Sequence, residues 1–318
     1  MMKLRHLFPV LLALVLFVSC AAAESFAPLP MDTTAIARPP RDECYLSERE
    51  YKDNTISVKI TEGDYLDVHY WCARVKITHP SQLRTVPARQ VDDPGAAFAG
   101  WRTGEAECTR MAAITNAVVA INGDYCNDID RCQIMLRQGQ QVRNMANGFY
   151  DVLIVDNDGN FDFIKNCGRK DYIEYYDAHP GSIYQVFCFG PAMVKDDAVI
   201  VDKAATRDNA NYVFYNKPAQ RTGIIQIGNL DYLLVTSDGD AQLNKFGLTI
   251  PQFADLCLIL GREASPEGAR LAYNLDGGNS SSLVFKVRDT SDRLVYTKLN
   301  MPERDRKLAD MICFVSLE

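Results

Sequence analysis

The chain has 318 residues, of which 47% are hydrophobic and 24% charged, and its formal net charge at pH 7 is −7. Nucleic acids and anionic membrane surfaces are held mainly through lysine and arginine, so this acidic balance argues against both as partners. Beyond the first 23 residues, no stretch approaches the roughly 20 apolar residues that a transmembrane helix requires.

The N-terminal segment has the pattern of a secretory signal peptide. Lys3, Arg5 and His6 precede an apolar run at residues 7–18, and small residues follow at 19–23. A basic start, an apolar centre and a small-residue cleavage site are the three parts of such a signal. The sequence therefore predicts a secreted or cell-surface protein.

These features divide the chain into three parts. We expect residues 1–23 to be cleaved, residues 24–48 to form a proline-containing lead-in, and residues 49–318 to form one domain. No internal linker or repeat suggests a second domain. A lipid anchor at Cys20 is the alternative to cleavage after residue 23.

Strand patterns dominate the domain. The turn residues Asn157-Asp158-Gly159 in DVLIVDNDGNFDFI predict a hairpin. Short apolar or alternating runs predict further strands. They lie at residues 56–60, 67–77, 117–121, 224–227, 232–236, 271–275, 283–287 and 311–316.

Helices are fewer. In LTIPQFADLCLILG, Thr249 and Gln252 suit a capping box, and Gly261 is expected to end the helix. A second helix is predicted over Glu105 to Asn116. This mixture indicates an α+β fold in which a large mixed or antiparallel sheet and a few packed helices form a single domain.

An exported chain can oxidise its cysteines, and their spacing here is not that of a zinc site. Nine cysteines follow Cys20, and no CxxC pair occurs among them. Cys126 and Cys132 lie in one polar segment, so we expect a disulfide between them. Cys257 and Cys313 lie in apolar segments and are expected to be buried thiols.

Candidate chemistry lies where strands end. Only four histidines occur, and the GxSxG, P-loop and HExxH motifs are absent, which argues against the commonest triad and zinc chemistries. Five segments instead run from a strand into small and polar residues, and we expect them to converge on one pocket. They supply Asn122, Asp124, Arg221, Asp238, Asn274 and Asp276.

The segment LAYNLDGGNSSSLVF is the most unusual of the five. Gly277 and Gly278 permit positive φ and close backbone approach, and the serines add hydroxyl groups, so the segment could hold an anion or a sugar. A β-hairpin turn is the alternative interpretation. Arg221 could likewise only pair with a carboxylate, Asp238 only occupy a turn, and Asn122 only cap a loop.

The order of several motifs resembles that of the phosphodiester glycosidase family. These motifs are AINGDY, FGPAMV, RTGI, LLVTSDG, GLTIPQFADLCLILG and AYNLDGGNSSSLV, and the resemblance extends from about Tyr51 to Phe314. It implies an exported hydrolase that cleaves a sugar-1-phosphodiester bond, for example in glycans containing N-acetylglucosamine-1-phosphate. Two positions depart from the family pattern: Asp240 stands where arginine is common, and Asn279 where a third glycine is common.

The residue types fit that chemistry. A phosphate leaving group needs positive charge and donors, and the expected phosphate-binding residues are Arg221, Thr222, Asn274, Gly277, Gly278, Ser280 and Ser281. A carboxylate is expected on the sugar side, and the candidate catalytic residues are Asp276, Asp124, Asp238 and Asn122.

Two other functions stay open. No metal or other cofactor is expected, but the three aspartates also have the oxygen ligands that Ca²⁺ or Mg²⁺ would need in a metal-dependent phosphoesterase. The second alternative is a carbohydrate- or phosphate-binding protein that has lost catalysis on the same scaffold.

Overall fold

The computed structural model describes residues 38–93, 104–128, 132–202, 215–239, 246–302 and 306–318. The predicted signal peptide with Cys20, residues 24–37 of the predicted lead-in, and Asp240 lie outside these residues. Within the described part of the chain, no helix combines the length and the apolar character needed to cross a bilayer.

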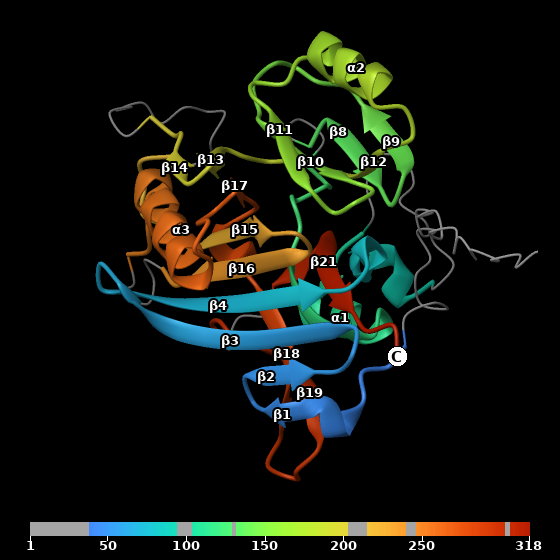
Figure 1. Ribbon diagram of the computed structural model, residues 1–318. Coiled ribbons are helices and arrows are strands. Elements are labelled where there is room, and N and C mark those ends of the chain that lie inside the picture. The colour runs from blue at the N-terminus through green and yellow to red at the C-terminus, as the bar shows by residue number, and fades with distance from the viewer. Residues whose placement is uncertain (1–37, 94–103, 129–131, 203–214, 240–245, 303–305) are drawn as a thin grey trace, which may run out of the picture.

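The fold is α+β, as predicted, and is dominated by antiparallel sheets (Figure 1). The largest sheet has nine strands. In spatial order they are β1 (Tyr45–Ser47), β2 (Glu50–Lys52), β3 (Ile56–Tyr65), β4 (Val68–Ile77), β16 (Asp231–Ser237), β15 (Arg221–Gly228), β17 (Leu271–Asn274), β13 (Ala192–Lys195) and β14 (Ala198–Val199).

Two five-stranded sheets and one two-stranded ribbon complete the β structure. The first five-stranded sheet contains β11 (Phe161–Ile164), β10 (Val152–Asp156), β12 (Ile183–Cys188), β8 (Ile134–Arg137) and β9 (Gln140–Asn144). The second contains β19 (Leu294–Lys298), β18 (Leu283–Arg288), β7 (Ala117–Asn122), β21 (Asp310–Val315) and β5 (Leu83–Pro87). The ribbon pairs β20 (Lys307–Leu308) with β6 (Ala106–Glu107).

Three α-helices lie on the sheets in the described residues: α1 (Cys108–Ile114), α2 (Arg169–Ala178) and α3 (Ile250–Ala264). The capping box of α3 forms as predicted, with the Thr249 amide donating to Gln252 Oε1 at 2.9 Å. Gly261 does not end this helix. A Cβ there would lie 2.6 Å from Ala269 Cβ, so the glycine allows close packing instead.

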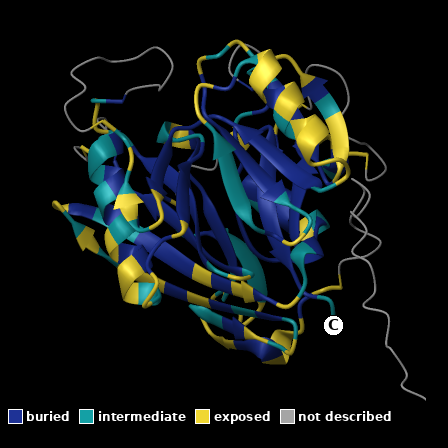
Figure 2. Cartoon of the chain, turned by 45° about the horizontal axis from the view of Figure 1, so that its top comes forward, coloured by how far each residue is buried: buried dark blue, intermediate teal, exposed yellow. Residues whose placement is uncertain are grey.

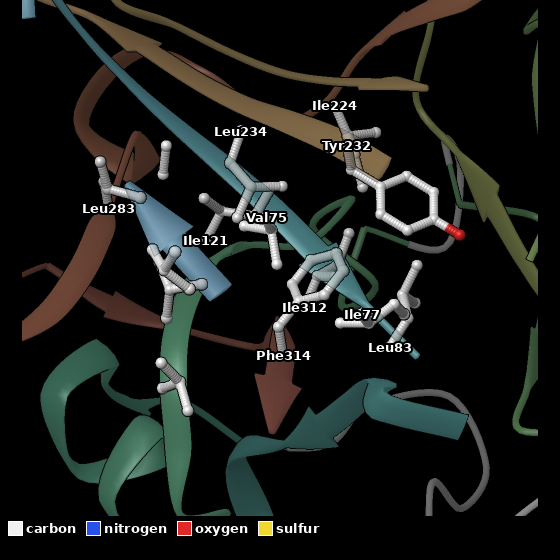
Figure 3. Packing of buried hydrophobic residues seen from close by; sticks show 14 of the residues in the cluster. Val75, Ile77, Leu83, Ile121, Ile224, Tyr232, Leu234, Leu283, Ile312 and Phe314 are labelled. Carbon is white, nitrogen blue, oxygen red and sulfur yellow. The ribbon is translucent and has the colours of Figure 1, made fainter. Parts of the chain in front are cut away.

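The central strands are buried on both faces. Ile224 and Leu234 point into the core that the nine-stranded sheet shares with β7, β18 and β21, where Phe314 also lies (Figure 3). Their neighbours Ile225 and Leu233 point the other way and pack with the apolar face of α3. Figure 2 shows the resulting buried interior, with exposed residues concentrated at the periphery and on α2.

This topology brings distant strand ends together. β15 begins at Arg221 and β17 ends at Asn274, and antiparallel pairing of Gly223 with Asn274 places both ends at one edge of the large sheet. From there the chain passes through residues 275–282 into β18, beside β7, which ends at Asn122. The glycine- and serine-rich segment is therefore a crossing between two sheets.

Candidate active site

Asn122 holds the crossing segment, residues 275–282, in place through hydrogen bonds. Its Nδ2 donates to the carbonyl oxygens of Asp276 at 2.7 Å and Gly123 at 3.2 Å. Its Oδ1 accepts from Thr222 Oγ1 at 2.9 Å and from the Ser282 amide at 3.0 Å. One buried side chain thus ties β7 to β15 and to both ends of the crossing.

Other predicted site residues also act as supports. Thr222 Oγ1 lies 3.0 Å from Ser281 Oγ, and Asn274 Nδ2 donates to the Gly190 carbonyl at 2.7 Å. Thr222, Asn274 and Ser281 are all buried. Hydrogen bonds of this kind fix the backbone above them.

Gly277 and Gly278 each occupy a position that a larger side chain would not fit or would strain. A Cβ on Gly277 would lie 2.6 Å from the Gln220 carbonyl oxygen, so only glycine allows this close approach to the start of β15. Gly278 has φ +59° and faces open space. Because β17 and β18 belong to different sheets, the hairpin interpretation of this segment is wrong.

The backbone amides of the crossing are already used within the protein. Gly277 N donates to Asp276 Oδ1 at 2.9 Å and Gly278 N to the Gln220 carbonyl at 2.9 Å. Ser280 N and Ser281 N donate to the carbonyls of Gly277 and Gly278. The glycines therefore make room beside the pocket, and their amides do not serve as the phosphate-binding donors expected of Gly277 and Gly278.

A pocket of about 520 Å³ opens above the crossing. Arg221 and Asp276 both line it, as expected from their strand ends, together with the two glycines. The remaining lining comes from residues that sequence reasoning did not select: Tyr125, Phe189, Lys217, Pro218, Ala219, Asn279 and Arg306. The pocket therefore joins five segments that are distant in the sequence.

Arg221 is held rigidly at the pocket wall. Only 4% of the residue is exposed, and its guanidinium donates to the carbonyls of Leu248 and Lys217, each at 2.8 Å. Burial lowers the pKa of Arg221 to about 10, which leaves it positively charged at neutral pH. A fixed, desolvated guanidinium is well suited to donate two N–H groups to two oxygens of an anion such as phosphate.

Arg306 adds a second guanidinium. Its Nη1 donates to Ser280 Oγ at 3.0 Å, and the group lies 5.5 Å from the centre of the Tyr125 ring. Lys217 adds a third cation at the rim, so three cationic side chains face the single carboxylate of Asp276 among the described lining residues. The pocket is therefore suited to an anionic ligand. In the sequence, the only signal for Arg306 was a charged run of the kind that usually faces solvent.

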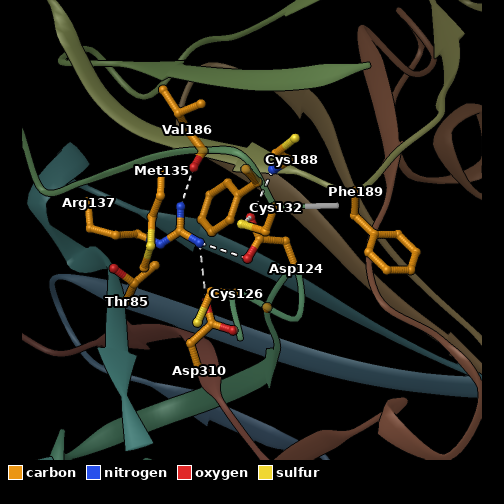
Figure 4. Close-up of polar contacts among 12 residues, drawn as sticks. Thr85, Asp124, Cys126, Cys132, Met135, Arg137, Val186, Cys188, Phe189 and Asp310 are labelled. Atoms are coloured by element: carbon orange, nitrogen blue, oxygen red, sulfur yellow. Dashed lines mark hydrogen bonds and ion pairs between the residues drawn. The ribbon is translucent and has the colours of Figure 1, made fainter. Parts of the chain in front are cut away.

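Asp124 lies in a closed ion cluster and does not line the pocket (Figure 4). Arg137 Nη2 donates to Asp124 Oδ1 at 2.8 Å and to Asp310 Oδ2 at 3.3 Å, and the three side chains are almost entirely buried. Asp124 Oδ2 also accepts from the Cys188 amide at 2.8 Å. This geometry corrects the expectation that Asp124 faces the substrate, because both its oxygens bind buried donors.

The expected disulfide is not formed. All nine described cysteines are free thiols, and Cys132 Sγ donates to Asp124 Oδ2 at 3.3 Å instead of bonding to Cys126. Burial raises the pKa of both thiols well above its usual value. Cys257 and Cys313 are fully buried, as predicted.

Asp238 lies in a neighbouring cavity. That cavity measures about 680 Å³ and is lined by Asp238, while Arg221 and Asp276 line the first pocket. Segment 217–221 separates the two, since Gly239 and Gly247 of the second pack against Ala219 of the first. The five strand ends therefore do not meet in one pocket, and the three aspartates do not form one set of metal ligands.

Comparisons with known proteins agree with this fold. The model of the family described as phosphodiester glycosidase matches residues 115–315. The catalytic domain of a zebrafish N-acetylglucosamine-1-phosphodiester alpha-N-acetylglucosaminidase, auto-inhibited by its pro-peptide, has a similar structure. It is 15% identical, with a TM-score of 0.59 over 85% of this chain and 86% of that one.

Two more distant structures are similar over most of the chain. A hypothetical protein from Synechocystis is 17% identical, with a TM-score of 0.47 over 82% of this chain and 62% of that one. A putative exported protein from Burkholderia pseudomallei K96243 is 13% identical, with a TM-score of 0.45 over 79% of this chain and 75% of that one. No curated protein matches the sequence.

Proposed function

Because the chain belongs to the phosphodiester glycosidase family, we propose that it is an exported hydrolase that cleaves a sugar-1-phosphodiester bond. Glycans containing N-acetylglucosamine-1-phosphate are the proposed substrates. The observation that carries the proposal is the pocket in which one carboxylate, Asp276, faces the cationic groups of Arg221, Arg306 and Lys217. The signal-peptide pattern at residues 1–23 supports export.

The leaving group explains the excess of positive charge. Hydrolysis breaks the bond between the anomeric carbon and the phosphate oxygen, and the electron pair of that bond goes to the phosphate. A phosphate monoester has a second pKa of about 6, so it leaves without the strong acid that a sugar alcohol needs. In the proposed mechanism, Arg221 binds the phosphate through its planar fork, and Arg306 and Lys217 stabilise the developing charge.

Asp276 supplies the sugar-side carboxylate. The Gly277 amide holds Asp276 Oδ1, and Asn122 holds the Asp276 backbone, so the carboxylate has a defined position at the pocket. There it either accepts a proton from the attacking water or stabilises the oxocarbenium-like centre. Asn122, Thr222, Asn274 and Ser281 act as positioning residues under this proposal, and Ser280 orients Arg306.

The test uses Asp276→Asn, which removes the charge and keeps the shape. With a methyl phosphodiester of N-acetylglucosamine-1-phosphate as substrate, we expect the release of N-acetylglucosamine to slow at least ~100-fold, about 2.7 kcal/mol of transition-state stabilisation. Arg221→Lys should raise KM, because an ammonium group cannot form the bidentate fork. Asp292→Asn is the matched control, since the Asp292 side chain is 84% exposed and does not line the pocket.

The same assay separates the alternatives. Near-wild-type turnover by the Asp276 variant would contradict the catalytic role of this residue. Loss of wild-type activity in EDTA would support a metal-dependent phosphoesterase. Binding of the phosphodiester without any hydrolysis by the wild-type protein would support a binding protein on the same scaffold.

A further inference from the structure

The cavity that contains Asp238 has no part in the proposed hydrolysis, although it is larger than the pocket of Arg221 and Asp276. One wall is formed by residues 64–71, at the turn between β3 and β4. This wall precedes residues 115–315, which match the family model. The cavity therefore depends on a part of the chain outside the matched region.

Exposed apolar side chains line this cavity. Leu66 is 57% exposed and Phe246 is 74% exposed, and Trp71 contributes a ring that is largely buried. Leu66 has φ +49° and Asp67 has φ +60°, in the two-residue turn that joins Tyr65 to Val68. Turns of this kind favour Asn-Gly, so an exposed leucine here is unfavourable both for the backbone and for solvation. A ligand that covers Leu66 would account for it.

Carboxylates are the main polar groups around these apolar side chains. His69 Nδ1 lies 3.0 Å from Asp64 Oδ1, and the imidazole meets the Trp71 ring edge to face, with centres 4.5 Å apart. Asp67 and Asp238 add two more carboxylates to the lining. Carboxylates accept hydrogen bonds from hydroxyl groups, and aromatic or aliphatic side chains pack on the apolar faces of sugar rings. An anionic ligand would be repelled by the three carboxylates.

We propose that this cavity is an accessory glycan subsite, which binds uncharged sugar rings attached beyond the phosphodiester. The link to the substrate rests on the proposed function. The two cavities lie on either side of segment 217–221 and differ in charge, with cations in one and carboxylates in the other. A substrate with a phosphate at one end and neutral rings at the other would therefore bind in one direction only.

Calorimetry with neutral tetrasaccharides tests the binding part without any need for activity. The probes are chitotetraose, cellotetraose and mannotetraose, with tetragalacturonate as the anionic comparison. We expect at least one neutral probe to bind the wild-type protein, and Leu66→Asn and Phe246→Ser each to weaken that binding at least 5-fold. Leu46→Asn is the matched control, because Leu46 is 58% exposed but lies on β1, outside this cavity lining.

Kinetics tests the link to the substrate. For a phosphodiester whose phosphate carries the bound tetrasaccharide, both variants should raise KM at least 5-fold, whereas KM for the methyl phosphodiester should stay unchanged. Absence of binding by all neutral probes, equal binding of tetragalacturonate, or equal affinity in both variants would overturn the proposal. Specific tetrasaccharide binding without any hydrolysis would refute the proposed function alone, and hydrolysis of the methyl substrate without such binding would refute the subsite alone.

Discussion

Asn122 provides the sharpest test of how the fold supports the candidate site, because its side chain fastens the segment that carries Asp276. The substitution Asn122→Ala removes this connection without touching the pocket lining. We expect both the stability of the protein and its catalytic rate to fall. The rate should fall because the Asp276 carbonyl loses its hydrogen bond from Asn122 Nδ2, which is 2.7 Å long and fixes the position of this residue.

The size of the stability change follows from the contacts. Four hydrogen bonds are lost, to the carbonyls of Asp276 and Gly123 and from Thr222 Oγ1 and the Ser282 amide. A net contribution of about 1 kcal/mol for each bond gives a loss of about 4 kcal/mol. Thr222 keeps its contact with Ser281 at 3.0 Å, which lowers the expected loss to about 3 kcal/mol. Since small domains unfold at about 5–15 kcal/mol, the variant should still fold.

Urea unfolding followed by circular dichroism measures this difference, with the midpoint expected to fall at constant slope. Asn157→Ala is the control, because Asn157 Nδ2 donates to the Gly181 carbonyl at 2.6 Å in an exposed turn. That variant should lose less than about 1 kcal/mol. If the two variants have the same unfolding free energy, or if Asn122→Ala hydrolyses substrate as fast as wild type, the anchoring role of Asn122 is refuted.

Three further predictions concern backbone, proton and thiol chemistry. Gly278→Val should lower the free energy of unfolding by about 1–2 kcal/mol, because φ at this position is +59°. It should also raise KM, because the new side chain would narrow the pocket. Thermal melting measures the first effect and kinetics the second, and unchanged values would contradict the prediction. Burial and the charge of Asp124 raise the pKa of Asp310 to about 7. The contribution of the Asp310 carboxyl to the free energy of unfolding is therefore full below the unfolded pKa of about 4. This contribution is lost as the pH rises through about 7. Asp310→Asn should remove this fall in urea titrations at several pH values, whereas an unchanged pH profile would count against the buried proton. Finally, the nine cysteines from Cys44 to Cys313 are buried, so a thiol reagent should label them only after unfolding; rapid labelling of the native protein would contradict this.

Local pattern was sufficient to predict the long central strands, but not short strands such as β1, β6 and β20. The middles of β15 and β16 are apolar, at residues 224–225 and 232–235, because both faces of these strands are buried, and such runs are visible in a sequence. The helix α2 could not be predicted in the same way. It buries only Tyr172 among its ten residues, so the apolar period that identifies a helix is missing. Its position is fixed by the packing of Tyr172, together with the partly buried Tyr175, on the first five-stranded sheet.

The different surroundings of the three candidate aspartates could not be predicted from the sequence. Asp124, Asp238 and Asp276 each follow a strand and adjoin a glycine, and nothing local distinguishes them. Their environments are set by partners that are distant in the chain: Arg137 and the Cys188 amide enclose Asp124, while His69 lies beside Asp238. Only the pairing order of the strands, which is a property of the whole sheet, could have separated the three.

Positive and negative side chains line different pockets. The chain is acidic overall, yet Lys217, Arg221 and Arg306 gather at one pocket, while Asp64 and Asp238 line the next. Net charge governs long-range attraction to extended polyanions, so it argues against nucleic acid as a partner. Affinity for one phosphate depends instead on charges within a Debye length of about 10 Å. An acidic protein can therefore bind an anion at one pocket, and the sign of that pocket follows from which strand ends the fold brings together.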